Sequence, residues 1–118
     1  MKRITSLVAV LAVAAVSVFT VVAYAGAEHA TATTIKVGAK EFSFTLSKKS
    51  APHGKVTFKV TNKGHIKHDF KINGKKTSML SPGKTATLTV TLKKGSYKYT
   101  CTVPGHAAAG MKGTFKAT

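Results

Sequence analysis

The chain has 118 residues, of which 19 are lysine or arginine and only three are acidic, so its formal net charge is +16 at pH 7. Its single cysteine has no partner for a disulfide within the chain. The basic residues are spread along the chain rather than clustered, without an arginine-rich segment or an RNA-binding aromatic motif, which argues against nucleic acid as a partner.

Residues 1–25 have the three parts of an export signal. Two basic residues precede an uncharged apolar run at 4–23, which ends in the small-x-small cleavage pattern Ala23-Tyr24-Ala25. The run approaches the roughly 20 apolar residues that span a bilayer, so an uncleaved membrane anchor is the alternative to a cleaved signal peptide. In both cases we expect the rest of the chain in the periplasm or on the outer face of the cytoplasmic membrane.

The exported part is expected to be a flexible lead-in at 26–33 followed by one domain at 34–118. It holds 17 of the 19 basic residues and all three acids, so its net charge is about +14. Such a charge favours an acidic partner protein, although a solvated lysine surface explains most of these residues equally well. We find no internal repeat, and we expect a monomer.

Apolar residues in the domain alternate with threonine and lysine, which is the period-two pattern of β-strands. Glycine, asparagine and proline mark the turns between them. The strands predicted in this way are 35–37, 42–46, 56–61, 68–72, 86–92, 97–101 and 113–117. Short strands separated by turns predict an all-β fold, a Greek-key sandwich or barrel of about six to eight strands.

The same alternation predicts that three potential metal ligands face the core. His68, Cys101 and Met111 are each in phase with an inward-pointing aromatic residue of their own strand. His106 lies between Cys101 and Met111, in the loop that follows a Pro-Gly turn. A loop that joins two neighbouring strands brings its ends together, so we expect these side chains at one end of the sandwich.

Two imidazoles, a thiolate and a thioether have few uses as one set. Zinc and calcium do not recruit a thioether, and haem attachment needs a Cys-x-x-Cys-His motif that is absent here. Copper accepts all four, and two histidines with one cysteine and a weak axial methionine form the blue-copper arrangement. The residues therefore predict one type 1 copper ion.

Each candidate ligand has a simpler interpretation. Cys101 would serve as a buried small hydrophobic residue and Met111 as core filler. His65 competes with His68 for the upstream position, but only His68 continues directly into the predicted strand at 68–72. No role is predicted for His29, His53 or Met79.

Residues 33–117 resemble the cupredoxins, the plastocyanin and azurin family of small blue copper proteins. The family's Y-x-C-x-x-P-G-H is present at 99–106 and its G-M-x-G at 110–113. The four-residue gaps on both sides of His106 are similar to those of auracyanin and rusticyanin, two members of the family. The ligands that this resemblance implies are His68, Cys101, His106 and Met111.

Two features depart from the family pattern. The residue after the upstream histidine is commonly Asn, whose side chain ties the two ligand loops together, and here it is Asp69. A charged Asp69 would lower the copper potential. The interval between His68 and Cys101 is also short, which leaves little room for the segment that covers one side of the barrel.

The resemblance implies a one-electron carrier that transforms no substrate. Its partners would be redox proteins, with an acidic docking surface to match the lysines, and the small residues 107–109 would let them approach His106. Copper storage or delivery is the alternative function. Enzymes with related domains use additional His-x-His motifs and a second domain, which this chain lacks, so we expect no enzymatic activity. A metal-free adhesion domain would leave the ligand set unexplained.

Overall fold

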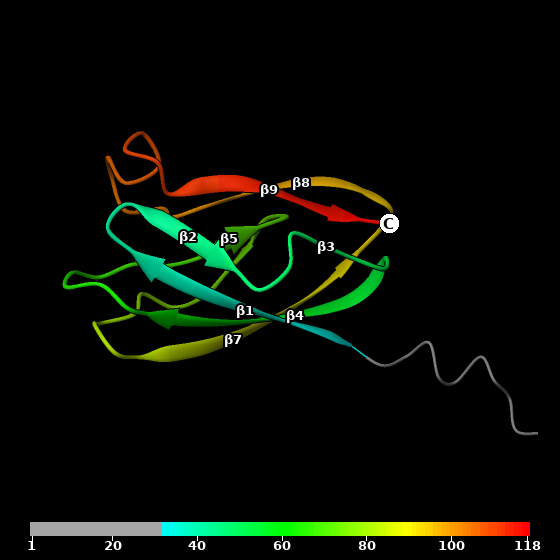
Figure 1. Ribbon diagram of the computed structural model, residues 1–118, viewed down its shortest axis with the longest axis horizontal. Helices are drawn as coiled ribbons and strands as arrows, with labels where there is room; N and C mark the ends of the chain where they lie inside the picture. The colour runs from blue at the N-terminus through cyan, green and yellow to red at the C-terminus, as the bar shows by residue number, and fades with distance from the viewer. Residues whose placement is uncertain (1–31) are drawn as a thin grey trace, which may run out of the picture.

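Two β-sheets pack face to face in the computed structural model, which describes residues 32–118 (Figure 1). The first sheet has the order β2-β1-β4-β7 and consists of β1 (Thr33–Lys40), β2 (Ser43–Leu46), β4 (Gly54–Asn62) and β7 (Thr85–Leu92). The second has the order β3-β9-β8-β5-β6 and consists of β3 (Ser50–Ala51), β5 (Lys71–Ile72), β6 (Lys75–Lys76), β8 (Gly95–Thr100) and β9 (Lys112–Ala117).

Most neighbouring strands are antiparallel, and two pairs are parallel, β1 with β4 and β3 with β9. The chain passes from one sheet to the other five times, before β3, β4, β5, β7 and β8. Strands that follow one another in sequence therefore often lie in opposite layers. This arrangement confirms the predicted all-β sandwich.

All seven predicted strands correspond to strands of the structure, although their ends differ. β1 begins at Thr33, the last residue assigned to the lead-in. β2 begins at Ser43, because Glu41 and Phe42 form the turn between β1 and β2. β3 and β6 were not predicted, since strands of two residues are too short to show an alternation. They bring the number of strands in residues 32–118 to nine.

The strand predicted at 68–72 is wrong in its first half. Only Lys71 and Ile72 form a strand, whereas His68 makes an isolated bridge with Leu80. The regular ladder is interrupted between this bridge and the strand, because the amide of Phe70 donates to the Thr77 hydroxyl rather than to the backbone of a neighbouring strand. His68 is nevertheless fully buried, as the alternation predicted.

Aromatic and branched side chains fill the space between the sheets. Val56, Phe58 and Val60 alternate along β4 with exposed or half-buried residues. The ring of Phe58 packs against those of Phe70 and Phe115, with centroids 5.1 and 5.2 Å apart. Burying one such side chain stabilises the fold by about 1.5–3 kcal/mol. This core holds both sheets in register, and with them the loops at the ends of the strands.

The predicted signal segment and nearly all of the predicted lead-in lie outside the described residues. Within residues 32–118, no helix is long and apolar enough to cross a membrane.

Candidate metal centre

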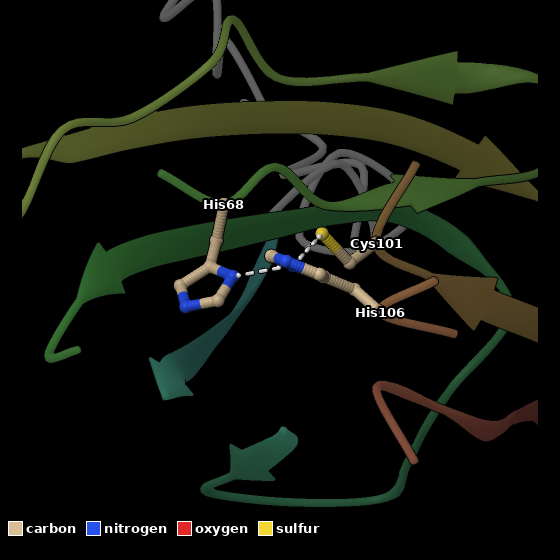
Figure 2. Close-up of side chains that lie close together, drawn as sticks. All are labelled: His68, Cys101 and His106. Atoms are coloured by element: carbon tan, nitrogen blue, oxygen red, sulfur yellow. Dashed lines mark hydrogen bonds between the residues drawn. The ribbon is translucent and has the colours of Figure 1, made fainter. Parts of the chain in front are cut away.

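Two histidines and the cysteine meet at one end of the sandwich. Figure 2 shows the side chains of His68, Cys101 and His106 pointing toward one another. The Nδ1 atoms of the two histidines are 3.1 Å apart, and the sulfur of Cys101 lies 3.6 Å from Nδ1 of His106. One ligand atom from each residue lies within 4.8 Å of the other two. This is the one cluster of three or more such residues within the part of the chain that the structure describes.

Cys101 and Met111 lie at the two ends of the loop between β8 and β9, orange in Figure 1. The amide of Cys101 donates to the carbonyl of Met111, and the amide of Met111 donates to the carbonyl of His106, both at 3.1 Å. Gly110 has a φ of 127°, and a Cβ there would lie 2.8 Å from the carbonyl oxygen of Phe42. Cys101, His106 and Met111 therefore lie on one tight loop, which packs against the β1–β2 turn.

Met111 is fully buried and packs in one small apolar cluster with Cys101 and Ala39. Its assignment as a ligand stays a prediction. His68 arrives from the opposite side, where its amide donates to the carbonyl of Leu80 and its carbonyl accepts from the amide of Leu80. These two reciprocal backbone hydrogen bonds fix the position of the His68 backbone, although no regular strand passes through it.

Asp69 links the two segments that carry the ligands. Its carboxylate accepts a hydrogen bond of 2.6 Å from the amide of Thr102, and the hydroxyl of Thr102 donates to the other oxygen. The segment of His68 is thereby tied to the residue that follows Cys101. An ionised carboxylate makes strong bonds with such donors, so Asp69 can tie the two loops together as the family's Asn does.

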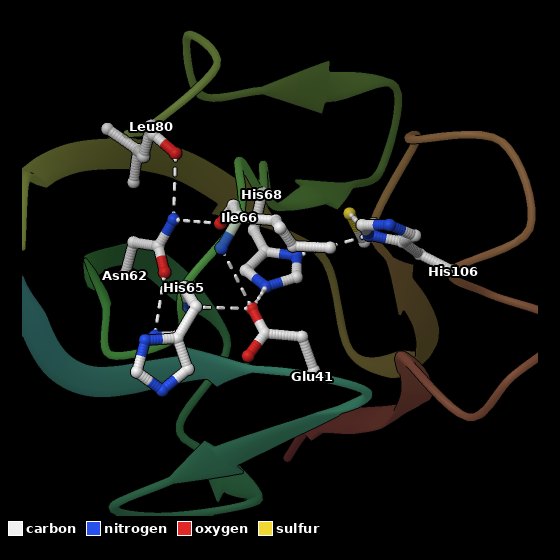
Figure 3. Close-up of polar contacts among 9 residues, drawn as sticks. Glu41, Asn62, His65, Ile66, His68, Leu80 and His106 are labelled. Carbon is white, nitrogen blue, oxygen red and sulfur yellow. Dashed lines mark hydrogen bonds and ion pairs between the residues drawn. The ribbon is translucent and has the colours of Figure 1, made fainter. Parts of the chain in front are cut away.

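Glu41 contacts the ring of His68 from the side away from the cluster, and Figure 3 shows this contact. One carboxylate oxygen lies 2.8 Å from Nε2 of His68, and the same oxygen accepts from the amides of His65 and Ile66 at 2.9 and 3.2 Å. Burial alone would raise the pKa of Glu41, but these hydrogen bonds outweigh it and lower the pKa to about 2.

The role of Glu41 was not predicted from the sequence. It lies in the β1–β2 turn, 27 positions before His68, and no local pattern connects the two. One signal was present in the composition, because an acid is rare in a chain with three acids and 19 basic residues.

Burial determines the state of the thiol in the cluster. Cys101 is 2% exposed, and this burial raises the pKa of the thiol. A soft cation bound next to the sulfur would displace the proton, because the thiolate is the metal-binding form. Cys101 is therefore suited to bind a metal ion rather than to react with molecules in solution.

The other histidines of the described residues lie apart from the cluster. His65 is exposed, and its amide rather than its ring takes part in the network around Glu41. Nδ1 of the exposed His53 is 2.7 Å from the carbonyl of Thr118, at the opposite end of the sandwich. Met79 is 47% exposed.

The donor set fits copper better than other metals. Two imidazole nitrogens and one sulfur converge, and all three residues are buried. The carboxylates of Glu41 and Asp69 are bonded to His68 and Thr102 instead of joining the cluster. Sulfur and imidazole without oxygen are the donors of His₂Cys blue-copper sites.

Comparison with known proteins supports the same conclusion. The chain matches the cupredoxin-like domain family over residues 10–114. It belongs to this family. The match confirms the resemblance inferred from the motifs at 99–106 and 110–113, and with it the fold of this cupredoxin.

Solved structures similar to this cupredoxin include three auracyanins. The reduced auracyanin of Roseiflexus castenholzii has a TM-score of 0.65 and 25% identity, covering 75% of this chain and 98% of its own. Auracyanin B has a TM-score of 0.63 and 26% identity, and the match covers 74% of this chain and 89% of auracyanin B. Auracyanin A of Chloroflexus aurantiacus, described as a "blue" copper protein, has a TM-score of 0.62 and covers 75% and 100%, but its 21% identity shows the fold alone.

A curated sequence relative is auracyanin-B of Chloroflexus aurantiacus. The two sequences are 49% identical over 43 residues, which is 36% of this cupredoxin. The aligned part spans 18% of the relative's length.

Proposed function

We propose that this cupredoxin is a type 1 blue copper protein that carries single electrons outside the cytoplasm, alternating between Cu(I) and Cu(II). The observation that carries the proposal is the buried cluster of two imidazole nitrogens and one sulfur, which suits both oxidation states. Met111 is the proposed axial ligand, because it is buried beside Cys101. The four proposed ligands are His68, Cys101, His106 and Met111. We expect no substrate and no enzymatic reaction.

When bound, copper supplies the one-electron couple, and the residues of the chain keep its surroundings constant. Glu41 and the backbone of Leu80 hold His68, while Asp69 and the loop backbone hold the segment of Cys101. The closely packed cluster leaves little room for water to act as an additional ligand. Little would therefore rearrange when an electron arrives or leaves, and transfer would be fast.

Copper storage or delivery is the alternative function, and burial argues against it. A delivery site needs exposed ligands that can be exchanged, whereas His68, Cys101 and Met111 are at most 2% exposed. His106 is 8% exposed, and we propose that its ring is the route by which the electron passes.

Exposed apolar side chains lie near the metal centre at this end of the protein. The ring of the exposed Phe42 contacts His106 edge-on, with centroids 5.2 Å apart. The exposed Ile66 donates its amide to Glu41. Small side chains continue this surface over residues 107–109. Grouped apolar side chains on a surface mark interaction sites, so we propose that the redox partner docks here.

Lysines supply the charge for docking. Lys36, Lys40, Lys59 and Lys63 line a depression of about 480 Å³ on the outer face of the four-stranded sheet. Lys36 lies directly opposite Lys59 in the register of β1 and β4. Neither acid within residues 32–118 pairs with these lysines, since the carboxylates of Glu41 and Asp69 are hydrogen-bonded to His68 and Thr102. An acidic surface on the partner would complement this charge.

Stopped-flow kinetics test the proposed function. The copper-loaded protein is expected to lose its colour when a redox protein with an acidic surface reduces it, and to regain the colour with an oxidant over repeated cycles. Copper should stay bound when a Cu(I) chelator is present throughout. Loss of copper to the chelator on reduction would contradict electron transfer and support delivery.

The same experiment at different salt concentrations tests the docking charge. The association rate should fall at least about tenfold between 0.01 and 1 M ionic strength, because screening shortens from about 30 to about 3 Å. Replacing the four lysines of the depression with Gln should remove most of this dependence. The matched control replaces Lys49, Lys93, Lys94 and Lys116 near the opposite end. A rate that does not change with salt would leave the apolar surface as the docking site.

A further inference from the structure

We propose that Glu41 is a positioning residue of the copper site, which orients the ring of His68, selects its tautomer and favours Cu(II) over Cu(I). This role rests on the proposed function, because it concerns a copper ion bound by His68. It goes beyond the ligand set, since Glu41 contacts the ligand rather than the metal position.

The two nitrogens of His68 face different partners. Nε2 is 2.8 Å from the carboxylate of Glu41, and Nδ1 is 3.1 Å from Nδ1 of His106 (Figure 3). An ionised carboxylate only accepts hydrogen bonds, so Nε2 of His68 must carry the proton. A neutral imidazole with its proton on Nε2 has its lone pair on Nδ1. Glu41 thereby presents Nδ1, the nitrogen that faces the cluster, as the metal-binding atom.

Glu41 is itself held firmly in place. The oxygen that contacts His68 also accepts hydrogen bonds from the backbone amides of His65 and Ile66. Gly64 allows this approach, because a Cβ at that position would overlap the carboxylate of Glu41. An acceptor with three donors around one oxygen has little freedom to move, so the orientation of His68 is fixed before any metal binds.

Asn62 completes the support behind this contact. Its side-chain amide donates to the carbonyls of Ile66 and Leu80, each at 2.8 Å, and its oxygen accepts from the amide of Gly64 at 2.9 Å. Asn62 is 1% exposed. The loop that carries the two amide donors to Glu41 is therefore joined to Leu80, whose backbone also pairs with His68.

The charge of Glu41 acts through the same bond. A carboxylate that accepts a hydrogen bond from the N–H of a ligating imidazole raises the basicity of the other ring nitrogen. A more basic nitrogen stabilises the doubly charged Cu(II) more than Cu(I). Glu41 should therefore lower the reduction potential of the site.

Two substitutions separate the effect of the length of the Glu41 side chain from the effect of its charge. Glu41→Gln keeps the length and an oxygen acceptor but loses the charge, whereas Glu41→Asp keeps the charge but is one methylene shorter. Glu41→Gln is expected to weaken Cu(II) binding about tenfold relative to Cu(I). This change raises the potential by about 59 mV, the value of a tenfold factor for one electron. Potentiometry on the blue form measures it.

NMR of the diamagnetic Cu(I) protein gives a readout that does not depend on the potential. The Nε2 proton of His68 should be visible and slow to exchange with water in the wild type and in Glu41→Gln. It should exchange rapidly in Glu41→Asp and in Gly64→Ala, which displaces the carboxylate without altering it. Gly38→Ala is the matched control for Gly64→Ala, because a Cβ at Gly38 would contact only the flexible side chain of Lys63, at 3.4 Å, and it should leave the Nε2 proton protected.

Two results would overturn the role of Glu41. One is a wild-type potential in Glu41→Gln, and the other is a protected Nε2 proton in both Glu41→Asp and Gly64→Ala. Either result would leave the proposed function intact as long as the wild type is blue. A wild type that forms no blue copper site would instead refute the proposed function, while a protected Nε2 proton in the metal-free wild type would still support the contact.

Discussion

Cys101→Ser is expected to abolish the blue colour of the copper-loaded protein and to weaken Cu(I) binding by more than about 100-fold. Loss of a residue that only supports a ligand already costs about 10–100-fold in metal affinity, and Cys101 would supply the strong bond of the trigonal plane. The change is small in volume, and Nδ1 of His106 lies beside the new hydroxyl, so the fold should persist.

Absorption spectra and competition with a Cu(I) chelator measure this effect, and circular dichroism checks the fold. Lys98→Ser is the matched control, because Lys98 lies in β8 but points outward and is exposed. A blue, tightly bound copper ion in Cys101→Ser would show that the sulfur is not a ligand. Cys101 would then be a buried core residue only.

Met111→Leu is expected to keep the blue site and to raise its reduction potential. Leucine has nearly the volume of methionine, and such swaps in a core usually cost less than about 1.5 kcal/mol. It donates nothing to Cu(II) and excludes water, so Cu(II) binding should weaken about tenfold relative to Cu(I), which raises the potential by about 59 mV. Met111→Gln should lower the potential, because an amide oxygen is a harder donor.

Potentiometry distinguishes these variants, and Met79→Leu is the matched control, since Met79 is 47% exposed and lies outside the cluster. An empty site in Met111→Leu with an intact fold would make Met111 a principal Cu(I) ligand. Copper delivery would then explain the protein better than electron transfer.

The sequence predicted which side chains come together on the loop between β8 and β9. Cys101, His106 and Met111 lie on one loop of eleven residues, so their spacing already implied that they meet. Alternation within β8 and β9 indicated which side chains face inward, because one face of each strand packs against the core. The long strands were found for the same reason.

Contacts between distant segments could not be predicted from one sequence. Glu41 reaches His68 because the β1–β2 turn lies beside the loop that follows β4. The strand predicted through His68 was too long, because His68 makes only an isolated bridge with Leu80 and the amide of Phe70 donates to the Thr77 hydroxyl. Both features depend on which strands are neighbours, and alternation carries no information about that.

The spectra of the copper-loaded protein show whether the metal centre is a blue-copper site. One equivalent of Cu(II) is added to the purified protein, and the visible and electron paramagnetic resonance spectra are recorded. A blue-copper site formed by His68, Cys101, His106 and Met111 predicts an intense thiolate-to-copper absorption band together with a narrow copper hyperfine splitting. A colourless or pale-blue complex with an ordinary wide splitting would contradict it.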